Sequence, residues 1–287
     1  MIVNVLVNVR RLRWCVAGAL MAVAMLAAPS VARADEDSLP SGEQVIEKSL
    51  EAMGGRAKLE AIKSRISVGS VELPRQNIKG SITIYEEYPN KNYTVAELEG
   101  AGKTESGCDG DVRWEISAMT GPRILEGEEK DFMERLGAIA AMTEWKRYYK
   151  EAKTSAIEDV NGRLHYRVAL IPQKGQPVYA FYDKKTYLQS KVLVVAKGAL
   201  GEVPLEVDFD DYRDTDGVLL PHRQTTHGAG IEQVLTIKSM KHNAQIPADR
   251  FKLPEPIKAL VERAKTQKPV TTTTPAPAPA TQPAKKP

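Results

Sequence analysis

Short segments of alternating apolar and polar residues, separated by tight-turn pairs, constrain the fold of this 287-residue chain most strongly. In residues 76–91, QNIKGSITIYEEYPNK, the two kinds of side chain fall on opposite sides of an extended strand. The apolar side holds Ile78, Ile82, Ile84 and Tyr88, and the polar side holds Lys79, Ser81, Thr83 and Glu87. Similar runs follow, and the residues between them are typical of hairpin turns. These turns are expected at Pro89-Asn90, residues 100–102, Asp109-Gly110, Asn161-Gly162, Lys174-Gly175 and Asp216-Gly217. The pattern predicts an antiparallel meander with one apolar face.

Five aspartates lie between residues 208 and 216, in the sequence DFDDYRDTDGVLLPHR. A calcium-binding loop of the EF-hand type that turns at Gly217 needs an acid at position 212 and a glutamate at position 223. Tyr212 and Arg223 occupy these two positions. We therefore predict a hairpin with its corner at residues 215–217, and no metal site.

Helical periodicity is confined to two regions. Ser41 followed by Gln44 fits a capping box, and the apolar residues from 45 to 53 form one face of a helix that Gly54-Gly55 would end. A short helical turn is expected next, over residues 56–62. In residues 127–152, GEEKDFMERLGAIAAMTEWKRYYKEA, apolar residues again recur at helical spacing, which predicts one helix or two.

The first 34 residues have the composition of an export signal. Three arginines in residues 10–13 precede an apolar run over residues 14–28, and the Ala-Arg-Ala sequence at 32–34 fits a cleavage site. The run of about 15 apolar residues is shorter than the roughly 20 that a membrane helix needs. Cys15 lies at the start of this run rather than at its end, unlike a lipid-modified cysteine. We expect a signal peptide over residues 1–34 and a periplasmic or secreted protein with no stable transmembrane span.

Removal of the signal would change the net charge and leave one cysteine. Without the four arginines of the signal, 36 basic residues face 37 acidic ones, so the net charge is about −1. This balance predicts no nucleic-acid partner. Cys108 alone cannot form an intramolecular disulfide, and we expect it to be a small buried or turn residue.

No motif for catalysis or for cofactor binding has the required spacing. The sequence EGAGKT at 99–104 lacks the first glycine of a phosphate-binding loop, because Glu97 stands at that position. The four histidines form no shared ligand set: two lie five apart on a predicted strand and face opposite ways, and two are isolated and expected at the surface. The two that lie five apart are His222 and His227, and the two isolated ones are His165 and His242. We therefore predict no cofactor, no metal and no enzymatic activity.

The C-terminal end predicts a tail. Residues 265–287 hold six prolines and six threonines but no aromatic residue, so they cannot form a core. The alternating Pro and Ala of residues 275–280 favour an extended polyproline II conformation, which suits either a spacer across a cell wall or a solvated tail. We expect one domain over residues 35–256 and a disordered tail over residues 257–287.

A series of segments, each a turn or strand signature, follows a recognisable order through residues 41–256. They are AMGGRAKLEAIKS at 52–64, PNK at 89–91, GCDGDVRW at 107–114, VNGRLHYRVAL at 160–170, FYDKKTYLQSK at 181–191, DYRDTDGVLLPHR at 211–223 and IPADRFKLP at 246–254. In this order the chain resembles the periplasmic lipoprotein-carrier (LolA/LolB-like) superfamily, especially its outer-membrane lipoprotein-sorting relatives. Cys108 is a departure, because such relatives often carry an aromatic residue there.

The resemblance implies an α+β fold: a strongly curved, unclosed antiparallel half-barrel of about eleven strands, with helices covering its concave face. Apolar surface between sheet and helices would then form a cavity able to hold acyl chains. Each buried methylene contributes about 0.8 kcal/mol, so one long chain could contribute on the order of 10 kcal/mol before the cost of association.

Five apolar residues are the candidate lining of this cavity, namely Trp114, Phe132, Leu136, Ile139 and Trp145. The same residues could instead form an ordinary core that leaves no cavity. We hypothesise a non-enzymatic, exported carrier or sensor of an acyl-chain lipid or a lipoprotein. The main alternative is a binding or scaffold module for another envelope protein. An envelope hydrolase would need a cluster of Ser, His and an acid, which the sequence does not display.

Overall fold

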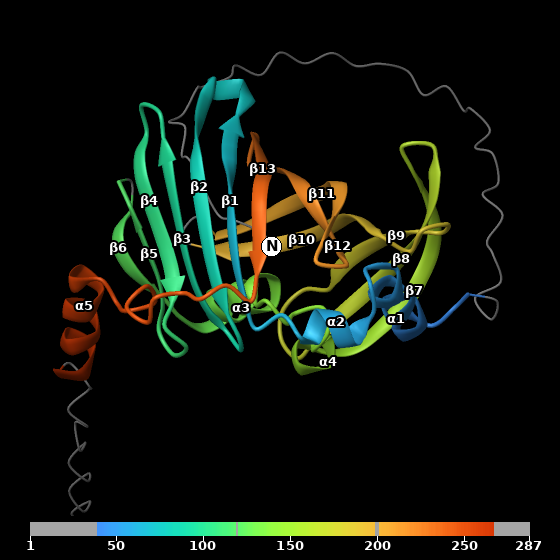
Figure 1. Ribbon diagram of the computed structural model, residues 1–287, viewed down its shortest axis with the longest axis horizontal. Coiled ribbons are helices and arrows are strands. Elements are labelled where there is room, and N and C mark those ends of the chain that lie inside the picture. The colour runs from blue at the N-terminus through green and yellow to red at the C-terminus, as the bar shows by residue number, and fades with distance from the viewer. Residues whose placement is uncertain (1–38, 119, 199–200, 267–287) are drawn as a thin grey trace, which may run out of the picture.

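The protein forms one open antiparallel sheet of 13 strands, seen in a computed structural model that describes residues 39–118, 120–198 and 201–266 (Figure 1). The strand order is β6-β5-β4-β3-β2-β1-β13-β12-β11-β10-β9-β8-β7, so β6 and β7 are the two free edges. The strands are β1 (Ser64–Leu73), β2 (Ile78–Glu87), β3 (Lys91–Leu98), β4 (Gly102–Cys108), β5 (Arg113–Ser117), β6 (Gly121–Leu125), β7 (Tyr149–Val160), β8 (Arg163–Pro172), β9 (Val178–Asp183), β10 (Gln189–Gly198), β11 (Gly201–Thr215), β12 (Val218–Gly228) and β13 (Ile231–His242).

The sheet curves strongly, because β1 to β6 stand upright in Figure 1 while β8 to β10 run in a clearly different direction. A curved, unclosed antiparallel sheet was expected, but it has 13 strands rather than about eleven. The expected count came from the family resemblance, and the two strands at the β6 edge, β5 and β6, have only five residues each.

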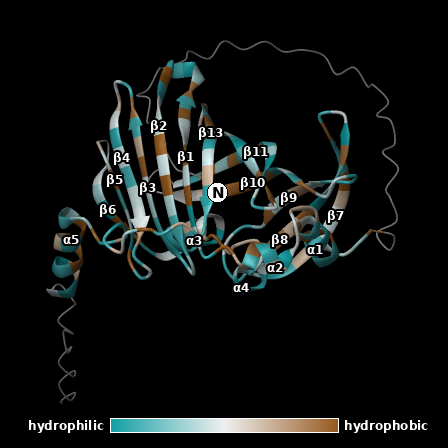
Figure 2. Ribbon diagram, viewed as in Figure 1, coloured by the Kyte–Doolittle hydropathy of each residue, from teal (hydrophilic) through white to brown (hydrophobic). Residues whose placement is uncertain are grey.

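Apolar and polar positions alternate along β2 (Figure 2), where Ile82 and Ile84 are buried as predicted and Tyr88 lies exposed beyond the end of the strand. The aspartate-rich segment forms the β11–β12 hairpin, which confirms the predicted turn. Its corner residues, Asp216 and Gly217, have φ angles of 55° and 74°. In the described residues, no group of three or more His, Cys, Asp or Glu side chains could hold a metal ion.

The helices are α1 (Gly42–Ala52), α2 (Arg56–Glu60), α3 (Gly127–Gly137), α4 (Trp145–Tyr148) and α5 (Glu255–Thr266), with a 3-10 turn at η2 (Pro74–Gln76). The predicted capping box of α1 is present: Gln44 N donates to Ser41 Oγ at 3.1 Å, and Ser41 N donates to Gln44 Oε1 at 2.7 Å. In the part of the chain described, no helix combines the length and the apolar character that a membrane span requires.

The predicted helical segment 127–152 differs from the structure in its second half. Helix α3 ends at Gly137, residues 138–144 are turns, and α4 ends at Tyr148. Tyr149 begins strand β7 because it pairs with Pro172 of β8, a long-range contact that helical spacing cannot reveal. We call residues 127–148 the cover segment, since they connect one free edge of the sheet, β6, to the other, β7.

Four helices lie on one face of the sheet, which we call the inner face. α1 and α4 pack on β7, and α3 packs on β10. A core of buried residues from α1, α3, α4 and strands β7 to β11 fills the contact; it includes Leu50, Phe132 and Val207. The backbones of α1 and β7 approach each other closely at Gly42, where a Cβ atom would lie 2.5 Å from the backbone of Ala152. The helices therefore cover the concave side, as the resemblance implied, except for α5.

Residues 243–266 instead cross the opposite, outer face of β1 to β6 and end in α5, which contacts β6 (Figure 1). The Arg250 guanidinium lies 4.7 Å from the ring centroid of Tyr85, and both Phe251 and Ile257 are buried. The prediction of a disordered tail from residue 257 is therefore wrong for residues 257–266. The predicted signal peptide and the proline-rich residues 267–287 lie outside the described residues.

An apolar cavity between the sheet and the cover segment

A cavity of about 210 Å³ lies between the inner face of the sheet and the helices. α1 and α2 contribute Ile46, Met53 and Leu59, and the turns after α3 contribute Met142. Strands β1, β2 and β7 to β13 supply most of the remaining wall, which includes Phe209 and several leucine and isoleucine side chains. The lining is therefore mainly apolar and comes from both layers of the fold.

The volume of this cavity bears on what it can hold. An apolar cavity of about 150 Å³ can bind benzene, whereas sites for larger ligands enclose about 300–1,000 Å³. At about 210 Å³ the cavity accommodates part of an acyl chain in the present conformation. A longer chain would require the cover segment or the surrounding side chains to move outward.

The structure brings together some of the residues predicted to line a pocket and separates others. Ile139 and Trp145 line the cavity. Phe132 is buried in the core beneath α3 and lines only a small neighbouring hollow against β9 and β10. The side chain of Leu136 lies outside the described residues, although its backbone belongs to α3.

Trp114 lies on the outer face and does not line the cavity. It pairs with Gly107 of β4, Gly107 pairs with Tyr93 of β3, and Tyr93 pairs with Tyr85 of β2, so these four residues share one face. Glu86, the neighbour of Tyr85, lines the cavity from the other face. The Trp114 side chain is only 2% exposed. The sequence predicted a strand at Trp114, after the Asp109-Gly110 turn, but it could not tell the inner face of the sheet from the outer one.

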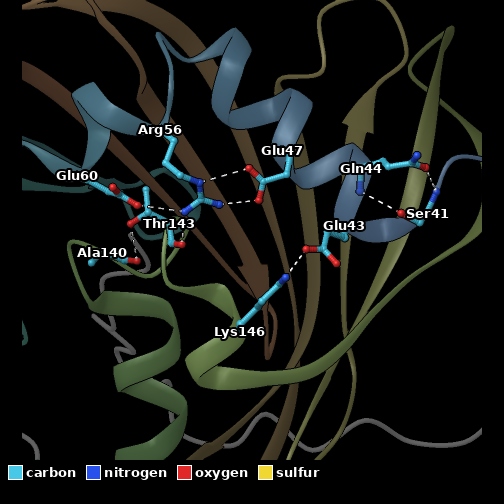
Figure 3. Close-up of polar contacts among 9 residues, drawn as sticks. All are labelled: Ser41, Glu43, Gln44, Glu47, Arg56, Glu60, Ala140, Thr143 and Lys146. Carbon is cyan, nitrogen blue, oxygen red and sulfur yellow. Dashed lines mark hydrogen bonds and ion pairs between the residues drawn. The ribbon is translucent and has the colours of Figure 1, made fainter.

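Polar contacts fasten the cover segment to α1 and α2 (Figure 3). Arg56 Nη2 lies 2.5 Å from Glu47 Oε1, and Arg56 Nη1 lies 3.2 Å from Glu60 Oε1. The same Nη1 donates to the carbonyl oxygen of Thr143 at 2.6 Å. Lys146 pairs with Glu43 of α1. The single side chain of Arg56 therefore links two helices to the turn that roofs the cavity.

An ion pair forms part of the cavity wall. The Arg65 guanidinium donates two hydrogen bonds to the Glu86 carboxylate, at 2.6 and 2.8 Å, and the two side chains are 13% and 3% exposed. Burial opposes the charge of Arg65, but the attraction of Glu86 is stronger, so the pKa of Arg65 is raised. The two charges offset each other, and this part of the wall carries no net charge.

A second polar group of residues comes from α3, β7 and β9. Tyr149 and Tyr182 line the cavity and are 5% and 3% exposed. Burial raises the pKa of Tyr149 to about 12 and also raises that of Tyr182, so both hydroxyls remain protonated donors at neutral pH. Arg135 also lines the cavity. Sequence reasoning missed this group because its members are brought together only by strand pairing and by the docking of α3.

Two histidines that were expected at the surface are buried. His165 is 2% exposed, and its Nδ1 lies 2.8 Å from the carbonyl oxygen of Arg163. The side chain of His242 lies at the β1–β13 pairing and is also almost fully buried. The prediction was wrong because isolation in sequence does not indicate exposure when distant strands pair. Cys108, in contrast, is buried as expected.

Comparison with known proteins supports the fold. No protein-family model matches the sequence, and no curated protein matches it. A LolA superfamily protein from Nitrosomonas europaea superposes with a TM-score of 0.51 at 13% identity, covering 75% of this chain and 99% of that chain. The fold is LolA-like. A DUF1329 family protein from Desulfovibrio piger gives a TM-score of 0.50 at 13% identity, covering 75% of this chain and 98% of that one. The likeness to the LolA-like half-barrel is thereby confirmed for the fold.

Proposed function

We propose that this protein is an exported carrier or sensor of an acyl-chain lipid or a lipoprotein, in the periplasm or outside the cell. The observation that carries the proposal is the apolar cavity left between the inner face of the sheet and the cover segment. The LolA-like fold supports it, because this architecture places helices over a concave sheet. The mechanism is the shielding of acyl methylenes from water, each worth about 0.8 kcal/mol.

The cavity also bears on the alternative of a scaffold module. A protein that only presents its surface to an envelope partner has no need of an unfilled interior, and unfilled space is destabilising. The lining of the cavity is mainly apolar, which is the composition expected of a site for acyl chains. The unfilled interior and its apolar lining therefore favour a lipid carrier over a scaffold module.

Native mass spectrometry of the protein purified from its own envelope, followed by lipid extraction, tests the proposal. We expect close to one lipid per protein molecule. Val192→Trp should fill the cavity and abolish both lipid recovery and uptake of a fluorescent fatty acid, because Val192 lines it. Val68→Trp is the matched control, since Val68 is a strand residue that is 41% exposed. Absence of lipid and of uptake in the unmodified protein, or full binding by Val192→Trp, would contradict the proposal.

A further inference from the structure

Three arginines contribute to the lining of the cavity, and one of them, Arg223, is exposed. The other two, Arg65 and Arg135, differ in their partners. Arg65 is held by both oxygens of Glu86. Arg135, on the last turn of α3, has no carboxylate within ion-pair distance among the described residues, and its Nε is buried without a hydrogen-bond partner. A positive charge that lines an apolar cavity without a counter-charge is unfavourable unless a ligand supplies one.

Two buried tyrosines line the same cavity as this charge. Arg135 is near enough to Tyr149 for its positive charge to act on that hydroxyl, and Tyr149 acts in turn on Tyr182. Both tyrosines are at least nine-tenths buried and line the cavity. Within the described part of the chain, neither hydroxyl makes a hydrogen bond to another residue. Three donors from α3, β7 and β9 therefore line one cavity with no acceptor assigned to them.

We propose that the ligand is a single-chain amphiphile with a negatively charged oxygen head, a carboxylate or a phosphate, held inside the cavity by Arg135, Tyr149 and Tyr182. This inference rests on the proposed function and adds the chemical class and the orientation of the ligand. Charged oxygens accept hydrogen bonds from a guanidinium and from phenol hydroxyls, and such charge-assisted bonds are the stronger ones. A neutral ester head would leave the charge of Arg135 without a counter-charge.

The orientation follows from the rest of the wall. The head lies between the buried Tyr149 and Tyr182 and the half-buried Arg135, and the chain extends along apolar side chains such as Phe209, Leu235 and Met240. The ion pair of Arg65 and Glu86 offers no free charge to compete for the head, and Arg223, the third arginine of the lining, is exposed to solvent. The head is therefore inside the protein, and the cavity recognises a charge as well as a chain.

Displacement of the neutral dye N-phenyl-1-naphthylamine, followed by fluorescence at pH 8, tests this inference with three ligands of equal chain length. They are dodecanoic acid, methyl dodecanoate and dodecyl phosphate. We expect one or both of the charged ligands to bind at least about tenfold more tightly than the ester. The tighter of the two identifies the head as a carboxylate or a phosphate.

Variants locate the head. Arg135→Gln should weaken binding of the preferred charged ligand by about tenfold or more and leave the ester unchanged. Tyr149→Phe and Tyr182→Phe should each weaken the charged ligand several-fold. Arg263→Gln, on the exposed surface of α5, is the control and should change nothing. Near-UV circular dichroism confirms that each variant is folded.

The outcomes separate the two proposals. Equal affinity for the acid, the phosphate and the ester, unchanged by Arg135→Gln, would overturn the charged-head inference and leave the acyl-chain proposal standing. Failure of all three ligands to displace the dye, together with the absence of copurified lipid, would overturn both.

Discussion

The two halves of the sheet are built from the same alternating strands, yet the segments that pack on them differ: helices lie on the inner face of one half, and the C-terminal segment crosses the outer face of the other. The inner face of that second half, with Ile82 and Ile84, is buried as well. Strands β7 to β11 are covered on the inner face by α1, α3 and α4, and a cavity remains beside that contact. Strands β1 to β6 are crossed on the outer face by residues 243–266, which bury Phe251 and Ile257. Alternation therefore determines that a strand has a buried face, but the tertiary fold determines which layer buries it.

The largest expected effect comes from removing a tryptophan in each half. Trp114→Ala and Trp145→Ala should each lower the free energy of unfolding by about 3–5 kcal/mol, because both rings are buried. Only Trp145→Ala should weaken binding of dodecanoic acid, since only Trp145 lines the cavity. Urea unfolding and dye displacement measure the two quantities. Equal loss of binding in both variants would show that the two halves do not act separately.

The next effect concerns the ion pair in the cavity wall. Glu86→Gln should lower the free energy of unfolding by about 3 kcal/mol, because it leaves the charge of Arg65 buried and unpaired. The double variant Arg65→Met with Glu86→Leu should recover most of this loss, since apolar residues of similar volume replace both charges. Thermal and urea unfolding of the three proteins give the comparison. A double variant as unstable as Glu86→Gln would show that the pair has a structural role beyond charge balance.

A smaller change in stability is expected from loosening the cover segment. Arg56→Ala should cost about 1 kcal/mol, because its ion pairs are well exposed and the hydrogen bond to Thr143 is the main loss. Backbone amides of residues 138–144 should exchange faster with deuterium, and bound lipid should dissociate faster. Lys58→Ala is the control, since Lys58 of α2 reaches the carbonyl of Gly217 instead of the cover segment. If deuterium exchange of residues 138–144 is unchanged in Arg56→Ala, Arg56 does not hold the cover segment in place.

The smallest effect is a pH dependence at the seam between the halves. Burial, and then the charge of Arg65, lower the pKa of His242 in the folded protein. In the unfolded chain His242 has its ordinary pKa of about 6.5, so below that pH the unfolded chain binds more protons than the folded protein. The contribution of His242 to the free energy of unfolding is therefore present above about pH 6.5 and is lost as the pH falls below it. His242→Gln should flatten the decline in melting temperature from pH 7 to pH 5. His227→Gln, at a more exposed histidine, should retain it.

Local features of the fold could be predicted from the sequence. The capping box of α1 and the turn at Asp216-Gly217 depend on residues a few positions apart, and both were predicted correctly. The buried positions of β2 follow from alternation within one strand. The curved, open sheet came from a resemblance carried by the order of several such segments, and the LolA-like fold confirms it.

Features that depend on distant contacts could not be predicted in this way. The face on which Trp114 lies depends on the register of β5 with β4 and β3, and the start of β7 depends on pairing with β8. Helix α5 was missed because the proline-rich composition beyond it dominated the interpretation, although Ile257, Leu260 and Val261 have helical spacing. The group of Arg135, Tyr149 and Tyr182 joins three separate elements, so no local pattern contained it.

The pairing of β1 with β13, which joins Arg65 to His242, has a consequence for how the molecule acquires its shape. In each half, β1 to β6 and β7 to β13, every strand pairs with the strand that follows it in the chain. These pairings join residues that are close in sequence, so each half should assemble quickly. The junction itself unites the first and last strands and must wait for the whole chain. We therefore expect two meanders to form early and their union to be the slow step, so that a chain whose last strand is not yet available has no completed cavity.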